Sequence, residues 1–156
     1  MYGVLAQCKA EGIHTAVETA LHVSETTLHR LLPLTDLVMM DIKLIDREKH
    51  KQSTGVDNTL ILANARAVSD AAVPIIIRTP IVPGVNDTPE EVAAIARFVA
   101  NLAGVRCWEL LPFHQLGESK AIRLGNDCPA RGLVPPTKEH MQQLRAVAGA
   151  SGVPVL

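Results

Sequence analysis

Short apolar runs rich in β-branched residues alternate along this chain with segments that have helical spacing. The runs occupy residues 13–19, 37–42, 73–82 and 105–111. Strands that are apolar on both faces and are joined by crossover helices typically form parallel sheets, because the crossover helices cover both faces of the sheet. The sequence therefore predicts an α/β fold with about four parallel strands.

The clearest helix signal follows the third run, in the segment NDTPEEVAAIARFVANLAG. Thr88 can cap this helix, Pro89 suits its first position, and Glu91 stands where it would complete a capping box. Gly104 can end the segment. The helix would bury an apolar stripe made of Val92, Ile95, Ala96, Val99 and Leu102. Weaker helix signals begin at Ser24, near Asn58 and at Thr137.

Length and charge limit the kind of protein this can be. The 156 residues, 47% of them hydrophobic, suit a single domain over residues 1–156. Fifteen basic and sixteen acidic side chains give a net charge of −1 without long charged runs, so neither nucleic acid nor a membrane surface is an expected partner. There is no apolar run of ~20 residues and no signal-peptide pattern, so we expect a cytosolic protein. Cys8, Cys107 and Cys128 are widely spaced and are expected to be free thiols.

Ionisable side chains lie at the ends of the predicted strands. Ligands of parallel α/β sheets collect at the carboxyl ends of the strands, so these charges form a candidate site. A buried charge is costly unless it is paired, so a purely structural set of ion pairs is the alternative. The charged residues are Glu18 in the first strand, Asp41 and Lys43 at the end of the second, Arg78 within the third and His114 after the fourth.

Six segments of this chain resemble, in order and spacing, the glycyl-radical-enzyme activating enzymes, that is, the pyruvate formate-lyase activating enzyme family of the radical S-adenosylmethionine superfamily. The resemblance runs from Cys8 onward and corresponds to the C-terminal two-thirds of the family. It implies a partial (β/α) barrel, the C-terminal part of a (β/α)6 barrel. The segments are GIHTAVET, TDLVMMDIK, HKQSTGVDN, IIIRTPIVPGVND, WELLPFHQLGESK and PPTKEHM.

The resemblance also implies a chemistry. Family members hold a [4Fe–4S] cluster and S-adenosylmethionine in the barrel mouth and take electrons from a reductant such as flavodoxin or ferredoxin. The 5′-deoxyadenosyl radical formed there removes a hydrogen atom from a glycine of the protein substrate, a glycyl radical enzyme. Which glycyl radical enzyme is activated does not follow from one sequence.

Site residues can be carried over by position in the resembling segments. Lys43, Arg78 and His114 match residues that contact S-adenosylmethionine in the family. A guanidinium suits the carboxylate of this cofactor, and an imidazole can reach its ribose or adenosyl side.

A second set matches a monovalent cation site beside the cofactor. Carboxylate, hydroxyl and main-chain oxygens suit such a hard ion. Met39 and Asp41 share one face of the second strand because side chains alternate. The set comprises Glu18, Thr19, Met39 and Asp41.

The chain departs from the family in three places. It lacks the C-x-x-x-C-x-x-C loop, so no [4Fe–4S] cluster is expected on this chain. It also lacks the GGEP segment, so we expect a fragment without roughly the first third of the family that is inactive alone. Leu21 stands where the family usually has glycine after a small or polar residue, and leucine adopts a positive φ less readily.

Two other functions stay open from the sequence. The chain could be a noncatalytic α/β unit with a remnant S-adenosylmethionine pocket and partner contacts through the loop 113–136. It could instead be a metal-dependent barrel enzyme that binds Mn or Fe through Glu18, Asp41 and His114. In the fragment, the strand at residues 13–19 would be an exposed barrel edge, which predicts self-association. His22, His29, His50 and His140 are expected to be solvated.

Overall fold

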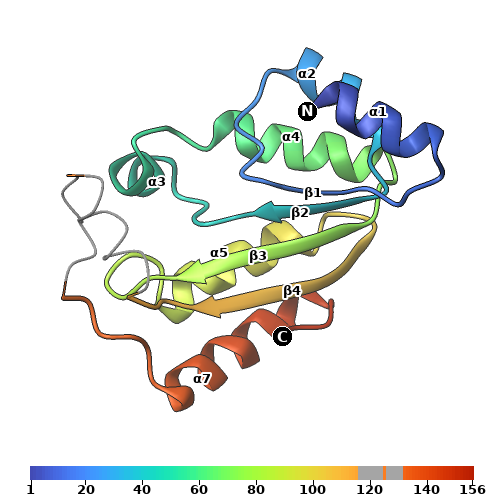
Figure 1. The fold of residues 1–156 in the computed structure, drawn as a ribbon. Helices are drawn as coiled ribbons and strands as arrows, with labels where there is room; N and C mark the ends of the chain where they lie inside the picture. Colours follow the sequence, from blue (N-terminus) through green and yellow to red (C-terminus); the bar gives the residue numbers. More distant parts are fainter. Residues whose placement is uncertain (116–124, 126–131) are drawn as a thin grey trace.

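The computed structural model describes residues 1–115, 125 and 132–156. Four strands form one sheet in the order β1-β2-β3-β4, and every neighbouring pair is parallel (Figure 1). The predicted α/β fold with four parallel strands is therefore confirmed. Cys128 and most of the loop 113–136 lie outside the described residues. The strands are β1 Ala16–Thr19, β2 Leu37–Asp41, β3 Ile75–Ile81 and β4 Val105–Pro112.

Helices connect the strands in the order that the alternating pattern predicts. The helices are α1 Tyr2–Ala10, α2 Glu25–Leu31, α3 Arg47–Thr54, α4 Thr59–Asp70, α5 Pro89–Val99 and α7 Lys138–Ala148, with 3₁₀ turns η1 Leu32–Leu34 and η2 Gly149–Ser151. The first strand is shorter than the predicted run 13–19. Thr15 instead donates through its hydroxyl to the Leu34 carbonyl and through its main-chain N–H to Asp36 Oδ2.

Side-chain caps fix where most of these helices begin. Ser24, Thr88 and Thr137 each accept a main-chain N–H at the start of α2, α5 and α7, as the sequence predicts. The predicted capping box at α5 is only half formed, because the carboxylate of Glu91 pairs with the Lys49 ammonium. The polar helix α3 has no apolar stripe and was not predicted, although Asp46 caps it.

The core lies between one face of the sheet and the helices. Burial alternates along β2 and β3, and α5 passes behind β3 in Figure 1. The predicted stripe of α5 is entirely buried, from Val92 to Leu102. Trp108 is fully buried, and its Nε1–H donates to Thr79 Oγ1 at 2.9 Å. Each fully buried large apolar side chain contributes about 1.5–3 kcal/mol, so this face supplies most of the stability.

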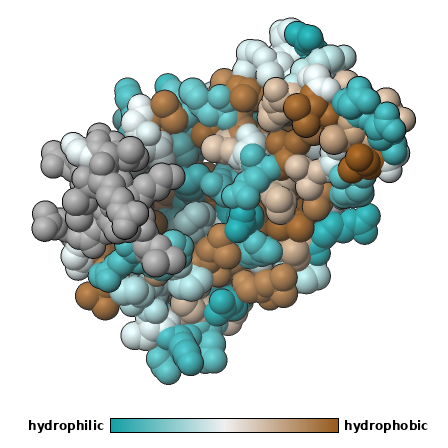
Figure 2. All heavy atoms as spheres, viewed as in Figure 1, coloured by the Kyte–Doolittle hydropathy of each residue, from teal (hydrophilic) through white to brown (hydrophobic). Residues whose placement is uncertain are grey.

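The opposite face of the sheet carries half-buried and exposed side chains, and we call it the open face. Its residues are Ala16, Glu18, Leu37, Met39, Asp41, Ile76, Arg78, Cys107, Glu109 and Leu111. In the space-filling view, hydrophilic residues lie in the middle of the molecule next to hydrophobic patches (Figure 2). Polar and apolar groups therefore share this face.

The two edges of the sheet differ. At the β4 edge, the C-terminal residues add a short parallel segment: Trp108 N–H donates to Pro154 O at 2.8 Å, and Leu156 N–H donates to Trp108 O at 2.9 Å. At the other edge, β1 pairs only with β2 among the described residues. Within the described ranges, no helix is both long and apolar enough to cross a membrane.

Candidate functional site

The strand alternation brings charged residues from all four strands onto the open face. The parallel register sets Asp41 beside Arg78 and Arg78 beside Glu109, so these three form a row across β2, β3 and β4. Glu18 of β1 is in register with Met39. Rows of this kind form because side chains at matching positions of neighbouring strands point the same way.

Arg78 is the centre of an ion-pair network. Its Nη1 lies 2.7 Å from Glu18 Oε1, and its Nε–H donates to Glu109 Oε2 at 3.0 Å. Glu18 and Arg78 belong to strands that are not neighbours, so the guanidinium group reaches across β2. Its side chain is only 24% exposed, which makes pairing necessary. The sequence did not single out Glu109, because its role depends on the β3–β4 register.

Lys43 forms the second pair of the open face. It lies just after β2, and its Nζ donates to Asp41 Oδ2 at 2.8 Å. Four of the five predicted charged residues are therefore paired, and each of the four has another member of this predicted set as a partner, as the structural alternative expects. His114 is exposed beyond the end of β4 and takes no part in these pairs.

The remaining predicted cation ligands lie on different faces. Met39 is half-buried on the open face, between Glu18 and Ile76 in register. Alternation turns Thr19 to the opposite face, where its Oγ1 accepts the N–H of Leu21 at 2.9 Å. The hydroxyl of Thr19 is therefore turned away from the open face.

The described residues do not fit a [4Fe–4S] cluster. Among them, no group of three or more histidine, cysteine or acidic side chains could hold a metal ion. Cys8 lies on α1 and Cys107 on β4, and burial, followed by the charge of Glu109, raises the pKa of the Cys107 thiol, which opposes the thiolate that iron requires. Glu18, Asp41 and His114, the ligands of the hard-metal alternative, are described residues and do not form such a group.

The loop after β1 contains a strained residue. Leu21 has φ 57°, in the left-handed region, and is only 1% exposed. Its N–H donates to Thr19 Oγ1, and its carbonyl accepts from Asn64 Nδ2 at 2.8 Å. The sequence marked this position as one where glycine would be expected, and the surrounding hydrogen bonds hold leucine there instead.

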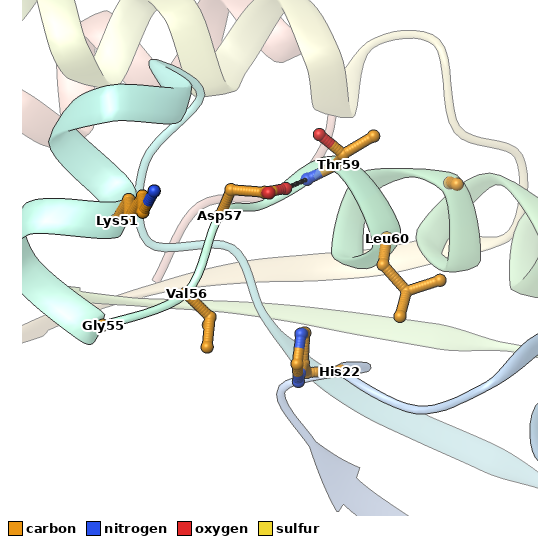
Figure 3. Close-up of a pocket in the computed structure, with 8 residues that line it drawn as sticks. His22, Lys51, Gly55, Val56, Asp57, Thr59 and Leu60 are labelled. Atoms are coloured by element: carbon orange, nitrogen blue, oxygen red, sulfur yellow. Dashed lines mark hydrogen bonds between the residues drawn. The ribbon is translucent and has the colours of Figure 1, made fainter.

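A hollow of about 600 Å³ lies beside the charged strand ends and does not include them (Figure 3). It is formed by the loop after β1, the end of α3 and the start of α4, and two of its lining residues are joined by a hydrogen bond from the Thr59 N–H to Asp57 Oδ1 at 2.9 Å. Lys43 and Arg78 do not line it, so the hollow is separate from the charged residues of the open face. Its lining residues include His22, Lys51, Val56 and Leu60.

His50 is buried, and the prediction that it is solvated is wrong. It is 3% exposed, and its Nδ1 lies 2.8 Å from Val56 O and 3.1 Å from Thr54 Oγ1. His140 is half-buried, and its Nε2 lies 2.7 Å from Asp87 O. Both histidines stabilise turns through hydrogen bonds with main-chain oxygens. Their positions in turns or on polar helix faces of the sequence do not indicate this role.

The chain is similar in sequence to curated proteins, although no protein-family model matches it. It is 38% identical over 157 residues to the 4-hydroxyphenylacetate decarboxylase activating enzyme of Clostridioides difficile (strain CD196), covering 98% of this chain and 49% of that protein. It is 34% identical over 151 residues to the pyruvate formate-lyase 1-activating enzyme of Escherichia coli (strain K12), covering 96% of this chain and 61% of that protein. The chain thus spans about half the length of the curated relatives it matches.

A solved structure of similar size also matches. It is a domain of a pyruvate-formate lyase-activating enzyme from Bacteroides vulgatus, with a TM-score of 0.82, 28% identity, and coverage of 99% of this chain and 87% of that one. A radical SAM methyltransferase from Sphaerobacter thermophilus matches with a TM-score of 0.67 at 15% identity, which supports the fold alone. These likenesses agree with a partial (β/α) barrel.

Proposed function

Because this chain is homologous over nearly its whole length to glycyl-radical-enzyme activating enzymes, we propose that it forms part of such an activase and binds S-adenosylmethionine at the open face. The observation that carries the proposal is the convergence of Lys43 and Arg78 on one face of the sheet in a chain with these relatives. Lys43 lies just past the carboxyl end of β2, on the side of the sheet edge where α/β sheets bind ligands, and Arg78 lies midway along β3 in register with Asp41, the last residue of β2.

The two cations fit a ligand that carries a carboxylate. Arg78 now holds Glu18 and Glu109, and Lys43 holds Asp41, so an incoming carboxylate would replace protein carboxylates at sites already shaped for one. In this proposal, His114 approaches the ribose or adenosyl side from the end of β4. Glu18, Asp41, Met39 and the Thr19 oxygen bind a monovalent cation once Arg78 and Lys43 turn to the cofactor.

The chemistry that S-adenosylmethionine supplies in this family is the removal of a hydrogen atom from a glycine. This chain's residues would bind and orient the cofactor, and the described part contains no set of ligands for the cluster that starts the reaction. The partner is a glycyl radical enzyme and the reductant a flavodoxin or ferredoxin. A cytosolic location stays a prediction, and the noncatalytic unit with a remnant pocket stays the alternative for the isolated chain.

Titration calorimetry of the chain with S-adenosylmethionine tests the proposal. Without cluster coordination we expect weak binding, roughly millimolar or worse, which corresponds to about 4 kcal/mol. Lys43→Ala and Arg78→Ala should each remove the residual heat, whereas Lys138→Ala, at the start of α7, should leave it unchanged. Residual binding that survives both site variants would refute the assignment of the open face.

A further inference from the structure

The segment that carries Lys43 is bound through four consecutive main-chain oxygens. Ile42 O accepts from Thr79 Oγ1 at 2.7 Å, and Lys43 O accepts from Asn86 Nδ2 at 2.8 Å. The next two oxygens, of residues 44 and 45, both accept from Asn58 Nδ2 at 2.9 Å. Thr79, Asn86 and Asn58 are at most 2% exposed. Buried side chains therefore fix the whole turn that follows β2.

Asn86 joins this turn to the neighbouring strand. Its second Nδ2–H donates to Pro80 O at 2.9 Å, and its Oδ1 accepts the Val82 N–H at 2.8 Å. Pro80 lies two residues after Arg78 in β3. One side-chain amide thus holds the end of β2, next to Lys43, against the end of β3, next to Arg78.

We propose that Asn86 is a positioning residue that sets the separation of Lys43 and Arg78. What the two cations bind rests on the proposed function, but the positioning itself does not. Without the amide, the oxygens of Lys43 and Pro80 would face each other with no donor between them and would repel. The Ile42 N–H would still hold β2 to Arg78 O at 3.0 Å, but the turn from Lys43 onward would move away from β3. A ligand that needs both cations would then first have to restore their separation.

Asn64 provides a matched control. It is 3% exposed, and its Nδ2 also bridges two main-chain oxygens, those of Leu21 and Val23, at 2.8 Å each. It lies on α4 and contacts the loop after β1 rather than the turn after β2. Asn64→Ala should therefore cost comparable stability without moving Lys43.

The experiment observes the Lys43 side chain directly by ¹³C NMR. Lysines are ¹³C-methylated reductively, and the Lys43 signal is assigned through its loss in Lys43→Arg. In the wild type, the pairing with Asp41 should separate this signal from those of exposed lysines. Asn86→Ala should move it toward the exposed lysines, and Asn64→Ala should leave it in place. Titration of the same signal with S-adenosylmethionine should show affinity falling about tenfold in Asn86→Ala and unchanged in Asn64→Ala.

The outcomes separate the positioning role from the proposed function. An unmoved Lys43 signal in folded Asn86→Ala, or an equal shift in both variants, would overturn the positioning role. If Asn86→Ala does not fold, Asn86→Ser, which retains one donor, is read in its place, with Asn64→Ser as its control. If the wild type shows no response to S-adenosylmethionine while the ligand-free shift still depends on Asn86, the positioning role stands and the cofactor assignment fails.

Discussion

The side-chain amide of Asn64 donates at 2.8 Å to the main-chain oxygen of Leu21, a buried leucine held at φ 57°. The same amide bonds Val23 O, so both sides of the turn after β1 are tied to α4. A left-handed conformation costs a leucine roughly 1–2 kcal/mol. The fold tolerates this cost because the leucine side chain also packs in the core.

This geometry predicts that glycine is more stable than alanine at position 21, which is the reverse of their order within a helix. Leu21→Ala and Leu21→Gly both lose core packing, which costs about 2–5 kcal/mol, but only glycine removes the backbone strain. Leu21→Gly should therefore be more stable than Leu21→Ala by about 1 kcal/mol in urea unfolding. At Leu28, a buried position of helix α2, glycine should instead be the less stable by about 1 kcal/mol. The same order at both positions would contradict the strain.

Acid should destabilise the protein through Asp36. The hydrogen bond from Lys9, followed by that from the Thr15 N–H, lowers the pKa of this carboxyl from 3.8 to about 2. A folded pKa below the unfolded one adds stability that is full above about pH 4 and is lost as the pH falls toward 2. Asp36→Asn should make the free energy of unfolding depend less on pH in that pH range.

Asp57 provides an internal comparison for the acid effect. Hydrogen bonds from Thr59, and then the charge of Arg47, lower its pKa to about 2 as well. Asp57→Asn should remove a similar share of the change in unfolding free energy with pH, about half if the two carboxyls contribute equally. The Asp36→Asn/Asp57→Asn variant should remove most of this pH dependence. An unchanged slope in the double variant would show that other groups govern acid unfolding.

The chain should not assemble a [4Fe–4S] cluster by itself. After anaerobic reconstitution with iron and sulfide, we expect neither the broad brown absorbance of such a cluster nor stoichiometric iron, because a cluster of this kind needs several converging thiolates. A Cys8→Ala/Cys107→Ala variant should retain the same low iron content. About four irons per wild-type chain, lost in that variant, would contradict the expectation.

The β1 edge should promote self-association. Ala16 and Glu18 are exposed there, and neither lysine nor proline blocks the strand. In sedimentation, the wild type should associate at high micromolar concentration, and Ala16→Lys should weaken association about tenfold, equivalent to about 1.4 kcal/mol. Val17→Lys is less suitable because Val17 is half-buried beside α2. Val134→Lys adds the same charge at an exposed residue outside β1 and should have no effect. A wild type that stays monomeric would refute the edge argument.

Sequence periodicity predicted the four strands, most of the helices and the faces of β2 and α5, but not the contacts between elements. The stripe of α5 and the alternation of Met39 and Asp41 follow from local spacing, so both could be read directly. Glu109 could not, because its contact with Arg78 requires the register of two strands about thirty residues apart. The burial of His50 depends on a turn closed by Val56 O, which no periodicity signals.

The asparagines after the strands were missed for a related reason. Asn58 and Asn86 lie in segments that resemble the family, yet asparagine in a loop is equally typical of an ordinary turn. Their donors reach oxygens 14 and 43 positions away. Only the folded chain reveals that Asn86 joins the ends of two strands and that Asn58 ties the turn after β2 to the start of α4.

The pairing of residues 154–156 with β4 limits how far the sheet can extend by adding chains. With β4 paired to this segment, that edge offers another molecule only the outer groups of residues 154–156, whereas β1 offers a strand whose outer side pairs with no other strand among the described residues. Two molecules that meet β1 to β1 around a two-fold axis each use this edge, so the contact is isologous and closes on itself. Edge addition would therefore favour a symmetric pair, and loss of the pairing of residues 154–156 would expose β4 as the second strand edge that an open-ended filament requires.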